Sequence, residues 1–536
     1  MTKKLAKYWG QATTLRIPIM KTFIYKQFAD FSDELNELNK FVDTSIHDYK
    51  NDKEPERELD ITKLLEEYKN SLLCNSPQTS LKVIENIFKK LLPYSIQTFS
   101  PKFIGHMTSA LPQFFKPLFN ILITFNQNPV KIETSLAFSF LERETLAKLH
   151  RLIYNNTDSF YSKTIQDSNK TLGIMTSGGT VANITALWCA RNNRLGPTKG
   201  FQGIEKKGIS SAMSFYNYTD SVIIGSELMH YSFEKALDIL GLGANNLIKI
   251  PVDKNHKIKI EKLIKEIKRC KKNNILIVAI VGIAGSTESG SIDDLKLLSK
   301  IARKSKIHFH VDAAWGGPVL FSKKYAQLLK GIEKADSVTI DGHKQLYLPM
   351  GSGLVFFSNP NFAKSIEKSA SYVIRKKSMD LGKRSLEGSR PANSLLLSSC
   401  LHILGKAGLE YLINEGIRKT KYLAKKIKQS SHFELLLKPK LNICLYRYIP
   451  KSLQESVYSN KIINTFNIQL QEHQKNRGVS FVSRTIIQRK INKKKLSVVY
   501  LRIVLANPLT TEKDIDEVLN EQISIAKEIE EKGEYR

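Results

Sequence analysis

Acidic side chains and cysteines are both scarce in this chain of 536 residues. Asp and Glu number 51 against 82 Lys and Arg, which gives a formal net charge of +31. The cysteines are odd in number, widely spaced and without a C-x-x-C pair: Cys74, Cys189, Cys270, Cys400 and Cys444. This pattern argues against a disulfide framework and a zinc ribbon, and it favours a reducing compartment.

Long apolar runs are also missing. The longest, residues 275–284, is about half of the ~20 residues that a membrane-spanning helix needs. The first residues are basic but lack the apolar stretch of a secretory signal. We therefore expect a cytoplasmic protein without a membrane-spanning segment.

The excess of positive charge suggests a nucleic acid or an acidic membrane as partner. However, residues 1–100 carry 15 basic and 14 acidic side chains, whereas residues 401–500 carry 20 and 5. The lysine-rich stretches 264–272 and 489–495 contain no aromatic side chains of the kind that stack on bases. We expect neither partner. The alternative to an enzyme is a function of a different class, namely a basic nucleic-acid- or membrane-binding protein on an inactive enzyme scaffold.

Apolar periodicity divides the chain into three parts. Residues 1–100 show the three- and four-residue spacing of amphipathic helices, for example at 59–65 and 81–92. In residues 101–404, short β-branched runs alternate with helical stretches, which is typical of buried parallel strands in an α/β fold. These runs are residues 221–225, 246–251, 275–284, 307–311, 337–340 and 353–357.

The third part, residues 405–536, mixes helices with alternating strands at 441–448 and 496–505. Residues 510–514 carry a helix-start signature ahead of an apolar helical pattern. We expect a small α+β domain here.

Four short motifs in the middle part carry polar residues that could do chemistry. A Gly-Gly turn followed by Thr180 precedes a helical stretch, where N–H groups and a hydroxyl can bind an anion. His230 follows one apolar run, and Asp312 ends another, where open α/β sheets place ligand-binding groups. Lys344 follows a third run and a glycine turn. Taken singly, the first two are more often only a turn and a hydrogen-bonded structural histidine, and the alternative for the third is an aspartate that caps a turn.

A metal site is a further possibility at His308 and His310, two residues apart on one run. Such spacing is common on strands, and no third ligand accompanies the pair. We expect no metal.

In their order and spacing, the four motifs resemble the pyridoxal-phosphate-dependent group II amino-acid decarboxylases, the glutamate and aromatic-amino-acid group. The resemblance runs from about residue 103 to 519 and includes two further stretches, 126–142 and 502–516. It implies an α/β fold of the PLP-dependent transferase type (aspartate aminotransferase fold type I), with a mostly parallel sheet flanked by helices. It also implies pyridoxal 5'-phosphate as cofactor and a homodimer with the active site at the interface.

The resemblance assigns a role to each motif residue. Lys344 would bond covalently to the cofactor aldehyde. Asp312 would face the pyridine nitrogen and favour its protonated form, and His230 would stack on the ring. The other implied cofactor contacts are Gly179, Thr180 and His343 at the phosphate, and Ala314 and Thr287 at the ring.

Two residues are implied to bind substrate. Arg390 matches a position that binds the substrate α-carboxylate in bacterial glutamate decarboxylases, and a guanidinium suits a planar carboxylate. The alternative for Arg390 is a salt bridge between domains. His106 would look toward the substrate side chain.

The chain departs from the family pattern at two places. Asp341 stands where relatives often have Asn or Ser, and an acid beside a phosphate is unfavourable unless it is paired or turned away. The loop that often supplies a catalytic tyrosine corresponds to residues 375–384 and contains none. Tyr347 and Tyr372 lie nearby, and neither can be assigned.

The stretches 341–351, 386–393 and 103–111 are most similar to a bacterial subgroup that converts L-aspartate to β-alanine and CO2 for pantothenate and coenzyme A supply. Decarboxylation of glutamate to γ-aminobutyrate is the second reading, and an aromatic amino acid the third. A basic rim would suit a dicarboxylic substrate, although it is equally consistent with solvated surface. Its residues are Arg375, Lys376, Lys377, Lys383 and Arg384.

Overall fold

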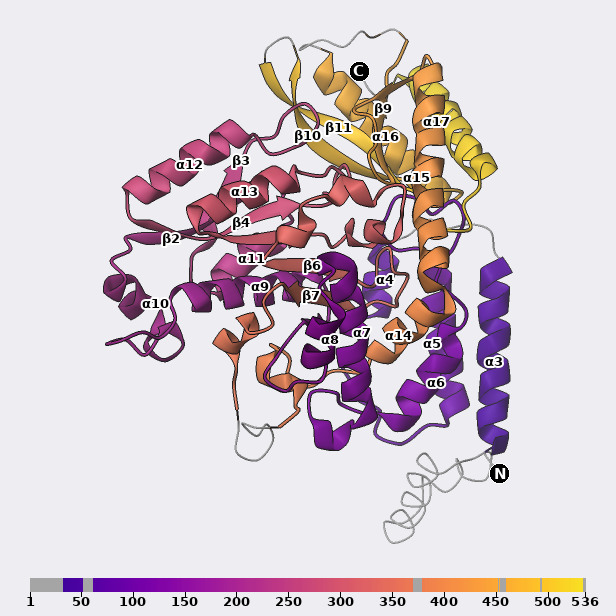
Figure 1. The fold of residues 1–536 in the computed structure, drawn as a ribbon. Helices are drawn as coiled ribbons and strands as arrows, with labels where there is room; N and C mark the ends of the chain where they lie inside the picture. Colours follow the sequence, from indigo (N-terminus) through magenta and orange to yellow (C-terminus); the bar gives the residue numbers. More distant parts are fainter. Residues whose placement is uncertain are drawn as a thin grey trace.

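The structure, a computed structural model, describes residues 32–51, 61–369, 378–451, 453, 459–491 and 494–533. Two sheets and the helices that cover them make up the fold (Figure 1). The larger sheet has seven strands in the order β1-β7-β6-β5-β4-β2-β3. They are β1 (Gly173–Thr176), β2 (Asp220–Ser226), β3 (Leu247–Ile250), β4 (Ile275–Ile283), β5 (His308–Asp312), β6 (Ser337–Asp341) and β7 (Gly353–Phe357).

The six expected strands of the middle part are all present, but one runs the other way. β2, β3, β4, β5 and β6 pair in parallel, whereas β7 is antiparallel to both β6 and β1. The expectation of a parallel strand at residues 353–357 is therefore wrong. The link from β6 to β7 contains no helix, and parallel pairing requires such a crossover.

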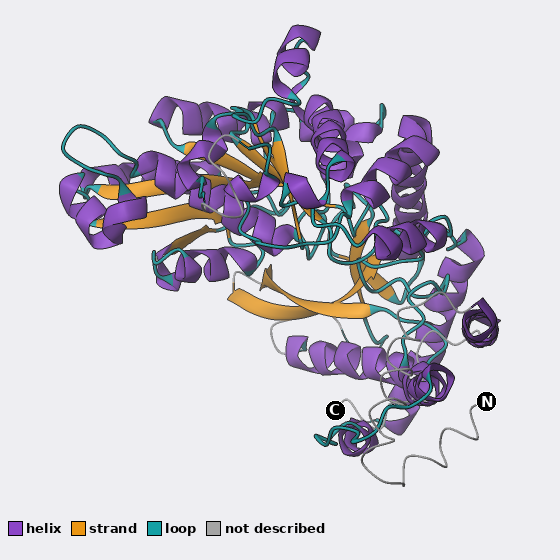
Figure 2. Cartoon of the chain, turned by 90° about the horizontal axis from the view of Figure 1, so that it is seen from below, coloured by secondary structure: helices purple, strands orange, loops and turns teal. Residues whose placement is uncertain are grey.

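Helices cover both faces of the larger sheet (Figure 2). On one side, α7 (Ala137–Tyr154), α12 (Ile260–Lys272) and α13 (Leu295–Ser305) share a buried apolar cluster with the strands. On the other side, α9 (Gly179–Arg194), α10 (Ile204–Phe215) and α11 (Ser232–Ile239) share a second cluster. Strands covered on both faces explain why their sequences are continuously apolar rather than alternating.

The smaller sheet is antiparallel and has the order β10-β11-β9-β8. Its strands are β8 (Phe433–Leu435), β9 (Ile443–Tyr448), β10 (Ser483–Ile491) and β11 (Lys494–Val504). It packs with α15 (Gly405–Gln429), α16 (Asn460–Arg477) and α17 (Glu512–Lys532), which share its buried cluster. The expected strands at 441–448 and 496–505 are confirmed, and so is the helix start, where Thr511 and Asp514 form a capping box. β10 was not expected.

Along the chain, the remaining α-helices come before β1, except for α14, which comes between β7 and β8. The expected helical character of the N-terminal part is confirmed in its described residues. These helices are α3 (Ser32–Asn51), α4 (Ile61–Glu67), α5 (Ser80–Leu91), α6 (Phe115–Phe125), α8 (Asp158–Thr164) and α14 (Ser394–Ile403). Among the described residues, no single helix has the length and apolarity to cross a membrane; α14 and α15, bent by 87°, pass that test only as a pair.

A short segment joins the N-terminal part to the smaller sheet. The Ile104 N–H donates to Phe481 O at 3.0 Å, and Val504 N–H donates to Ile104 O at 2.7 Å. Ile104 is fully buried in the cluster of the smaller sheet. This contact places the start of the middle part against β11, and the divisions at residues 100 and 404 stay predictions.

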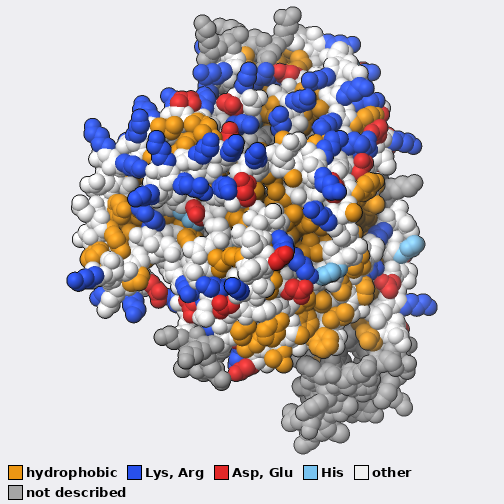
Figure 3. Space-filling model, viewed as in Figure 1, with side chains coloured by type: hydrophobic (Ala, Val, Ile, Leu, Met, Phe, Trp, Pro, Cys, Tyr) orange, Lys and Arg blue, Asp and Glu red, His pale blue; other side chains and the backbone are white. Residues whose placement is uncertain are grey.

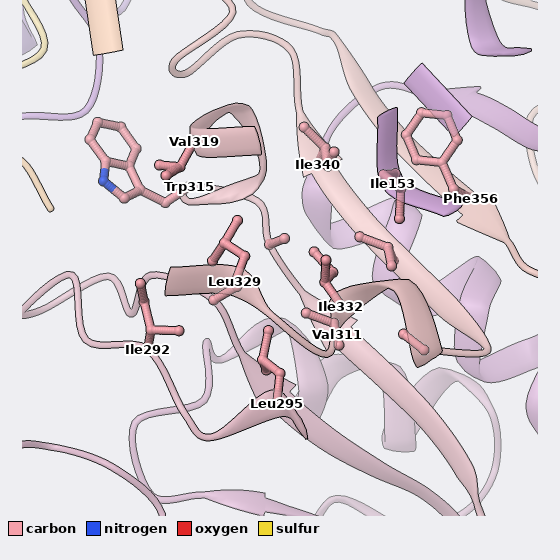
Figure 4. Packing of buried hydrophobic residues seen from close by; sticks show 14 of the residues in the cluster. Ile153, Ile292, Leu295, Val311, Trp315, Val319, Leu329, Ile332, Ile340 and Phe356 are labelled. Atoms are coloured by element: carbon pink, nitrogen blue, oxygen red, sulfur yellow. The ribbon is translucent and has the colours of Figure 1, made fainter. Parts of the chain in front are cut away.

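The core between β5 and α13 supplies a test of stability. In Figure 4, the buried side chains of Leu295 and Val311 lie within one apolar cluster. Leu298, also on α13, is fully buried in the same cluster. We expect Leu298→Ala to lower the free energy of unfolding by about 2–5 kcal/mol, because it leaves a cavity. Chemical denaturation measures this, and Leu297→Ala, at a partly exposed neighbour, should cost under about 0.5 kcal/mol.

Candidate active site

A cavity of about 680 Å³ opens at the carboxyl edge of the larger sheet. Its walls come from the residues that follow β1, β2, β4, β5 and β6, and from the beginning of β10 and the end of β11. Open α/β sheets place ligand sites at this edge, because the carboxyl ends of all their parallel strands meet there. The predicted residues that line the cavity are His106, Gly179, Thr180, His230, Thr287, Asp312, Ala314, His343 and Lys344.

The amine of Lys344 is held by a carboxylate. Lys344 Nζ lies 2.8 Å from Asp341 Oδ2, and the Asp341 side chain is almost fully buried. His343 Nε2 lies 3.8 Å from the same oxygen. The other Asp341 oxygen, Oδ1, is buried and has no hydrogen-bond partner. Lys344 therefore lies in the cavity beside a carboxylate of which only one oxygen has a close partner.

Asp312, at the end of β5, accepts hydrogen bonds from two neutral donors. Ala314 N–H donates to Oδ1 at 3.1 Å, and Asn183 Nδ2 donates to Oδ2 at 3.3 Å. The Asn183 Oδ1 atom in turn lies 3.0 Å from His310 Nε2. Because an amide oxygen only accepts, His310 carries its proton on Nε2.

The two strand histidines are neutral parts of this network. His310 Nδ1 and His308 Nε2 both bond to Ser337 Oγ, at 2.8 and 2.7 Å. Burial lowers the pKa of each histidine to about 3. Both rings bond to protein groups, and neither lines the cavity.

His230 and His106 also line the cavity. The Ser232 N–H donates to His230 Nδ1 at 3.2 Å, which leaves the other ring nitrogen to carry the proton of the neutral form. Burial lowers the pKa of His230, while Asp312 opposes that shift. Burial lowers the pKa of His106, and the positive charges of Arg502 and Lys344 lower it further.

Besides Asp341, three charged residues of the cavity were not predicted as site residues: Arg484, Arg502 and Glu288. Arg502, on β11, donates from Nε to Thr287 O at 2.9 Å, and its Nη2 is buried without a partner. Burial lowers the pKa of Arg502 to about 10. Glu288 has a buried Oε2 without a partner, and burial raises the pKa of its carboxyl. An arginine inside the apolar run 498–505 was the signal in the sequence, since a buried strand holds a cation only at a cost.

Arg390, predicted to bind substrate, does not line the cavity. Its guanidinium forms a two-pronged ion pair with Glu142 of α7, with Nη1 2.7 Å from Oε2, and both side chains are buried. It borders a separate small cavity of about 40 Å³. Arg390 is therefore part of a salt bridge, because Glu142 already occupies both ends of its fork. Both residues lie in the predicted middle part, so the bridge is not the one between domains that was the alternative.

The proposed basic rim is wrong at the two members that the structure describes. Lys383 and Arg384 are buried, and Arg384 pairs with Glu367 at 2.6 Å and donates to Thr171 Oγ1 at 2.9 Å. Arg375, Lys376, Lys377 and Tyr372 lie outside the described residues. Tyr347 is buried and donates to Ala506 O at 2.8 Å, so its hydroxyl is engaged away from the cavity.

Residues 63–449 match the conserved domain of pyridoxal-dependent decarboxylases. The chain belongs to this family. It is 44% identical over 475 residues to an aspartate 1-decarboxylase of Aliivibrio fischeri, covering 87% of each chain. It is 29% identical to the acidic amino acid decarboxylase GADL1 of Xenopus tropicalis, over 81% of this chain and 80% of that one.

Solved structures confirm the predicted fold of this decarboxylase. Mouse CSAD superimposes with a TM-score of 0.79 at 23% identity, covering 92% of this chain and 99% of that one. The Oryza sativa TDC structure with PLP and tryptamine gives a TM-score of 0.80 at 17% identity, covering 93% and 99%. The predictions of the family, the PLP-dependent decarboxylase activity and pyridoxal phosphate as cofactor are also confirmed by the family match.

The cavity of the enzyme fits this cofactor. A primary amine, Lys344, and a carboxylate without a Lys or Arg ion pair in the described residues, Asp312, face the same space. At about 680 Å³, that space lies within the usual range for ligand sites. The free N–H groups at the start of α9, a helix of 16 residues, also border this space and suit a phosphate.

The neutral histidines of the decarboxylase make stability depend on pH. The folded-state pKa of His310 is about 3, whereas that of an unfolded histidine is about 6.5. The unfolded state therefore binds the extra proton below pH ~6.5, and the free energy of unfolding falls as the pH drops toward 3. We expect His310→Gln to reduce the slope between pH 6 and 4.5 by up to about 1.4 kcal/mol per pH unit.

Denaturant titrations across that range measure the slope. The matched control is His402→Gln on α14, an exposed histidine outside the network, where the wild-type slope should persist. An unchanged slope in His310→Gln would show that this histidine is not held neutral in the fold.

Proposed function

We propose that the enzyme removes the α-carboxylate of L-aspartate, giving β-alanine and CO2. The observation that carries this proposal is the buried, partly unpartnered guanidinium of Arg502 in the same cavity as Lys344. An acidic amino acid keeps one carboxylate after decarboxylation, and a buried cation suits that group. The 44% identity to the Aliivibrio fischeri aspartate 1-decarboxylase supports aspartate over glutamate.

The residues around Lys344 would hold the cofactor. Lys344 would bond to its aldehyde, and Asp312 would pair with its pyridine nitrogen, since that carboxylate meets only neutral donors in the described residues. His230 and Ala314 would border the ring on its two sides. When bound, pyridoxal phosphate draws electrons from the substrate Cα, which allows the carboxylate to leave as CO2.

The other groups orient the substrate and the protons. A hydrogen-bond network fixes the Asp312 carboxylate. His310 Nε2–H donates to Asn183 Oδ1, and Asn183 Nδ2 donates to Asp312 Oδ2, so the direction of each bond is set by the next. Gly179, Thr180 and His343 would bind the phosphate. His106 would contact the substrate side chain, since it lines the same cavity as Arg502 and Lys344.

Substrate identity has a direct test. Purified enzyme with pyridoxal phosphate is supplied with L-aspartate and L-glutamate separately, and the amine products are identified. We expect kcat/KM for aspartate to exceed that for glutamate by about 10-fold or more, the range of one methylene group. Lys344→Ala should abolish turnover of both. Faster turnover of glutamate would contradict the aspartate proposal and leave the decarboxylase assignment intact.

Arg502 has its own test. Replacing it in Arg502→Gln removes the charge that would bind a substrate carboxylate, so kcat/KM for aspartate should fall by about 10²-fold. The control is Arg484→Gln, which also lines the cavity. Arg484 is already bonded to Gln471 at 2.7 Å and to Glu472 at 3.1 Å, so its loss should change kcat/KM less than about 3-fold. Equal losses in both variants would argue against a special role for Arg502.

We also propose that the enzyme is a homodimer. The apolar helix α6 exposes Phe119, Ile123 and Phe125, and Leu136 lies exposed just beyond it. Figure 3 shows hydrophobic side chains gathered on this lower part of the face. An exposed apolar patch of this kind is typical of a protein interface, and the family resemblance implies a second copy of the chain as its partner.

Sedimentation measures the dimer directly. Ile123 is 73% exposed on α6, so Ile123→Asp places a charge in the proposed interface without disturbing the core. We expect this variant to sediment as a monomer, while Ile239→Asp, at a 63% exposed position on α11, should sediment as wild type. A wild-type monomer with full activity would contradict the proposal.

A cytoplasmic location completes the proposal. All five cysteines are free thiols in the structure, and four of them are buried. Proteins of reducing compartments keep their thiols in this form.

A further inference from the structure

The carboxylate of Asp341 lies inside the site where the cofactor phosphate would bind. A Cβ built on Gly179, the first residue of α9, would lie 2.8 and 2.9 Å from the two Asp341 oxygens. Helix starts favour anions because their first N–H groups have no intrahelical partner. The chain thus carries its own anion at the place that suits a phosphate.

Hydrogen-bond accounting shows what this carboxylate lacks. Oδ2 has one close partner, the Lys344 ammonium at 2.8 Å, and Oδ1 is buried with none. When the Lys344 nitrogen bonds to the cofactor, it no longer offers three N–H donors to Asp341. A buried carboxylate without donors is costly, so the bound state must supply one.

His343 does not supply that donor in its neutral form. Its Nδ1 lies 2.9 Å from Ser352 O, and a carbonyl oxygen only accepts, so the ring proton is on Nδ1. Nε2, 3.8 Å from Asp341 Oδ2, then carries a lone pair. Asp341 and the neutral His343 ring therefore both present acceptors to the phosphate site.

The other charged groups around Asp341 add little positive charge. His230 lies in the loop after β2. Burial lowers the pKa of His230, although the charge of Asp341 acts to raise it. From the segment before α14, Glu387 Oε1 accepts from Ser177 N–H at 3.2 Å, and its Oε2 is buried without a partner. Asp312 at the end of β5 brings a further carboxylate to the cavity. The N–H groups at the start of α9 can bind either form of the phosphate. A dianion leaves Asp341 Oδ1 facing another acceptor, whereas a phosphate that keeps one proton brings the missing donor.

We propose that Asp341 accepts a hydrogen bond from the cofactor phosphate, so that this enzyme binds the phosphate as its monoanion. The proton is the one that the phosphate monoester already carries; it stays on the phosphate oxygen and points to Asp341 Oδ1. The proposal rests on the placement of the phosphate at Gly179 and Thr180 described under the proposed function.

The ³¹P resonance of bound pyridoxal phosphate reports the protonation of its phosphate directly. Free phosphate monoesters lose their second proton near pH 6, so a pH titration of free cofactor supplies both reference shifts. At pH 7.5 to 8.5 we expect the wild-type holoenzyme to show the monoanion shift. Asp341→Asn, whose amide can donate to the phosphate, should move the resonance to the dianion shift. A dianion shift in wild type, or no difference between the two proteins, would overturn the proposal.

The pH dependence of cofactor affinity is a second readout. The ratio of the affinities for pyridoxal phosphate and pyridoxal isolates the phosphate, because both compounds present the same aldehyde to Lys344. In wild type this ratio should fall by up to about tenfold per pH unit between pH 7 and 8.5, as the monoanion becomes scarce. In Asp341→Asn and Asp341→Ala the ratio should stay nearly constant, and a ratio independent of pH in wild type would contradict the proposal.

Thr180→Val separates this inference from the placement on which it rests. If the phosphate lies at the start of α9, loss of the hydroxyl should lower the affinity ratio several-fold at every pH. If Thr180→Val has no effect, the placement itself is wrong. If Thr180→Val weakens binding and Asp341→Asn leaves the ³¹P shift unchanged, the placement stands and the role of Asp341 is refuted. Thermal unfolding of each apoprotein verifies that the variants fold.

Discussion

Parallel pairing of β4, β5 and β6 brings the acidic groups of the site together, and the other contacts of the site follow from it. In this register, Asp312 pairs with Thr339, which sets Asp341 two residues further along the neighbouring strand. Both carboxylates then stand at the same edge, above strands buried on both faces. A slip by one residue would turn the apolar side chains of a strand to the wrong layer, so the packing of the sheet also holds the two acids in position.

The same packing explains why so much of the site was readable from the sequence. Each motif residue lies at the carboxyl end of a buried run or within four residues of it, so recognising the run is enough to place Asp312 and Lys344 at the carboxyl edge. The direction of β7 was less accessible, since it depends on the absence of a crossover helix rather than on the composition of residues 353–357. In β10 only Ile487 and Ile491 are buried and Ile486 is exposed, so the apolar residues do not show the alternation of a strand.

Arg390 and Arg502 show where sequence reasoning ended. The local sequence around Arg390 resembles a substrate-binding motif, yet its partner Glu142 lies 248 residues earlier in the chain and only the fold brings the two together. Arg502 lies in a strand of the smaller sheet, and it enters the cavity because residues 103–105 pack against β11. Both outcomes depend on long-range contacts that neither periodicity nor motif spacing encodes. Lys383 and Arg384 are a similar case, because a run of charges near a site says nothing about burial.

The net charge of the chain and the charge of its active site are different quantities. Within the cavity, the carboxylates of Glu288, Asp312 and Asp341 face the cations of Lys344, Arg484 and Arg502. Arg484 is bonded to α16 and Lys344 to Asp341, so Arg502 is the cation with a buried donor left over. Long-range steering by a charge of +31 acts alike on every acidic molecule and is screened by salt. Under the proposed function, the choice among acidic amino acids would depend on the distance between Arg502 and Lys344, which a substrate one methylene longer would span differently.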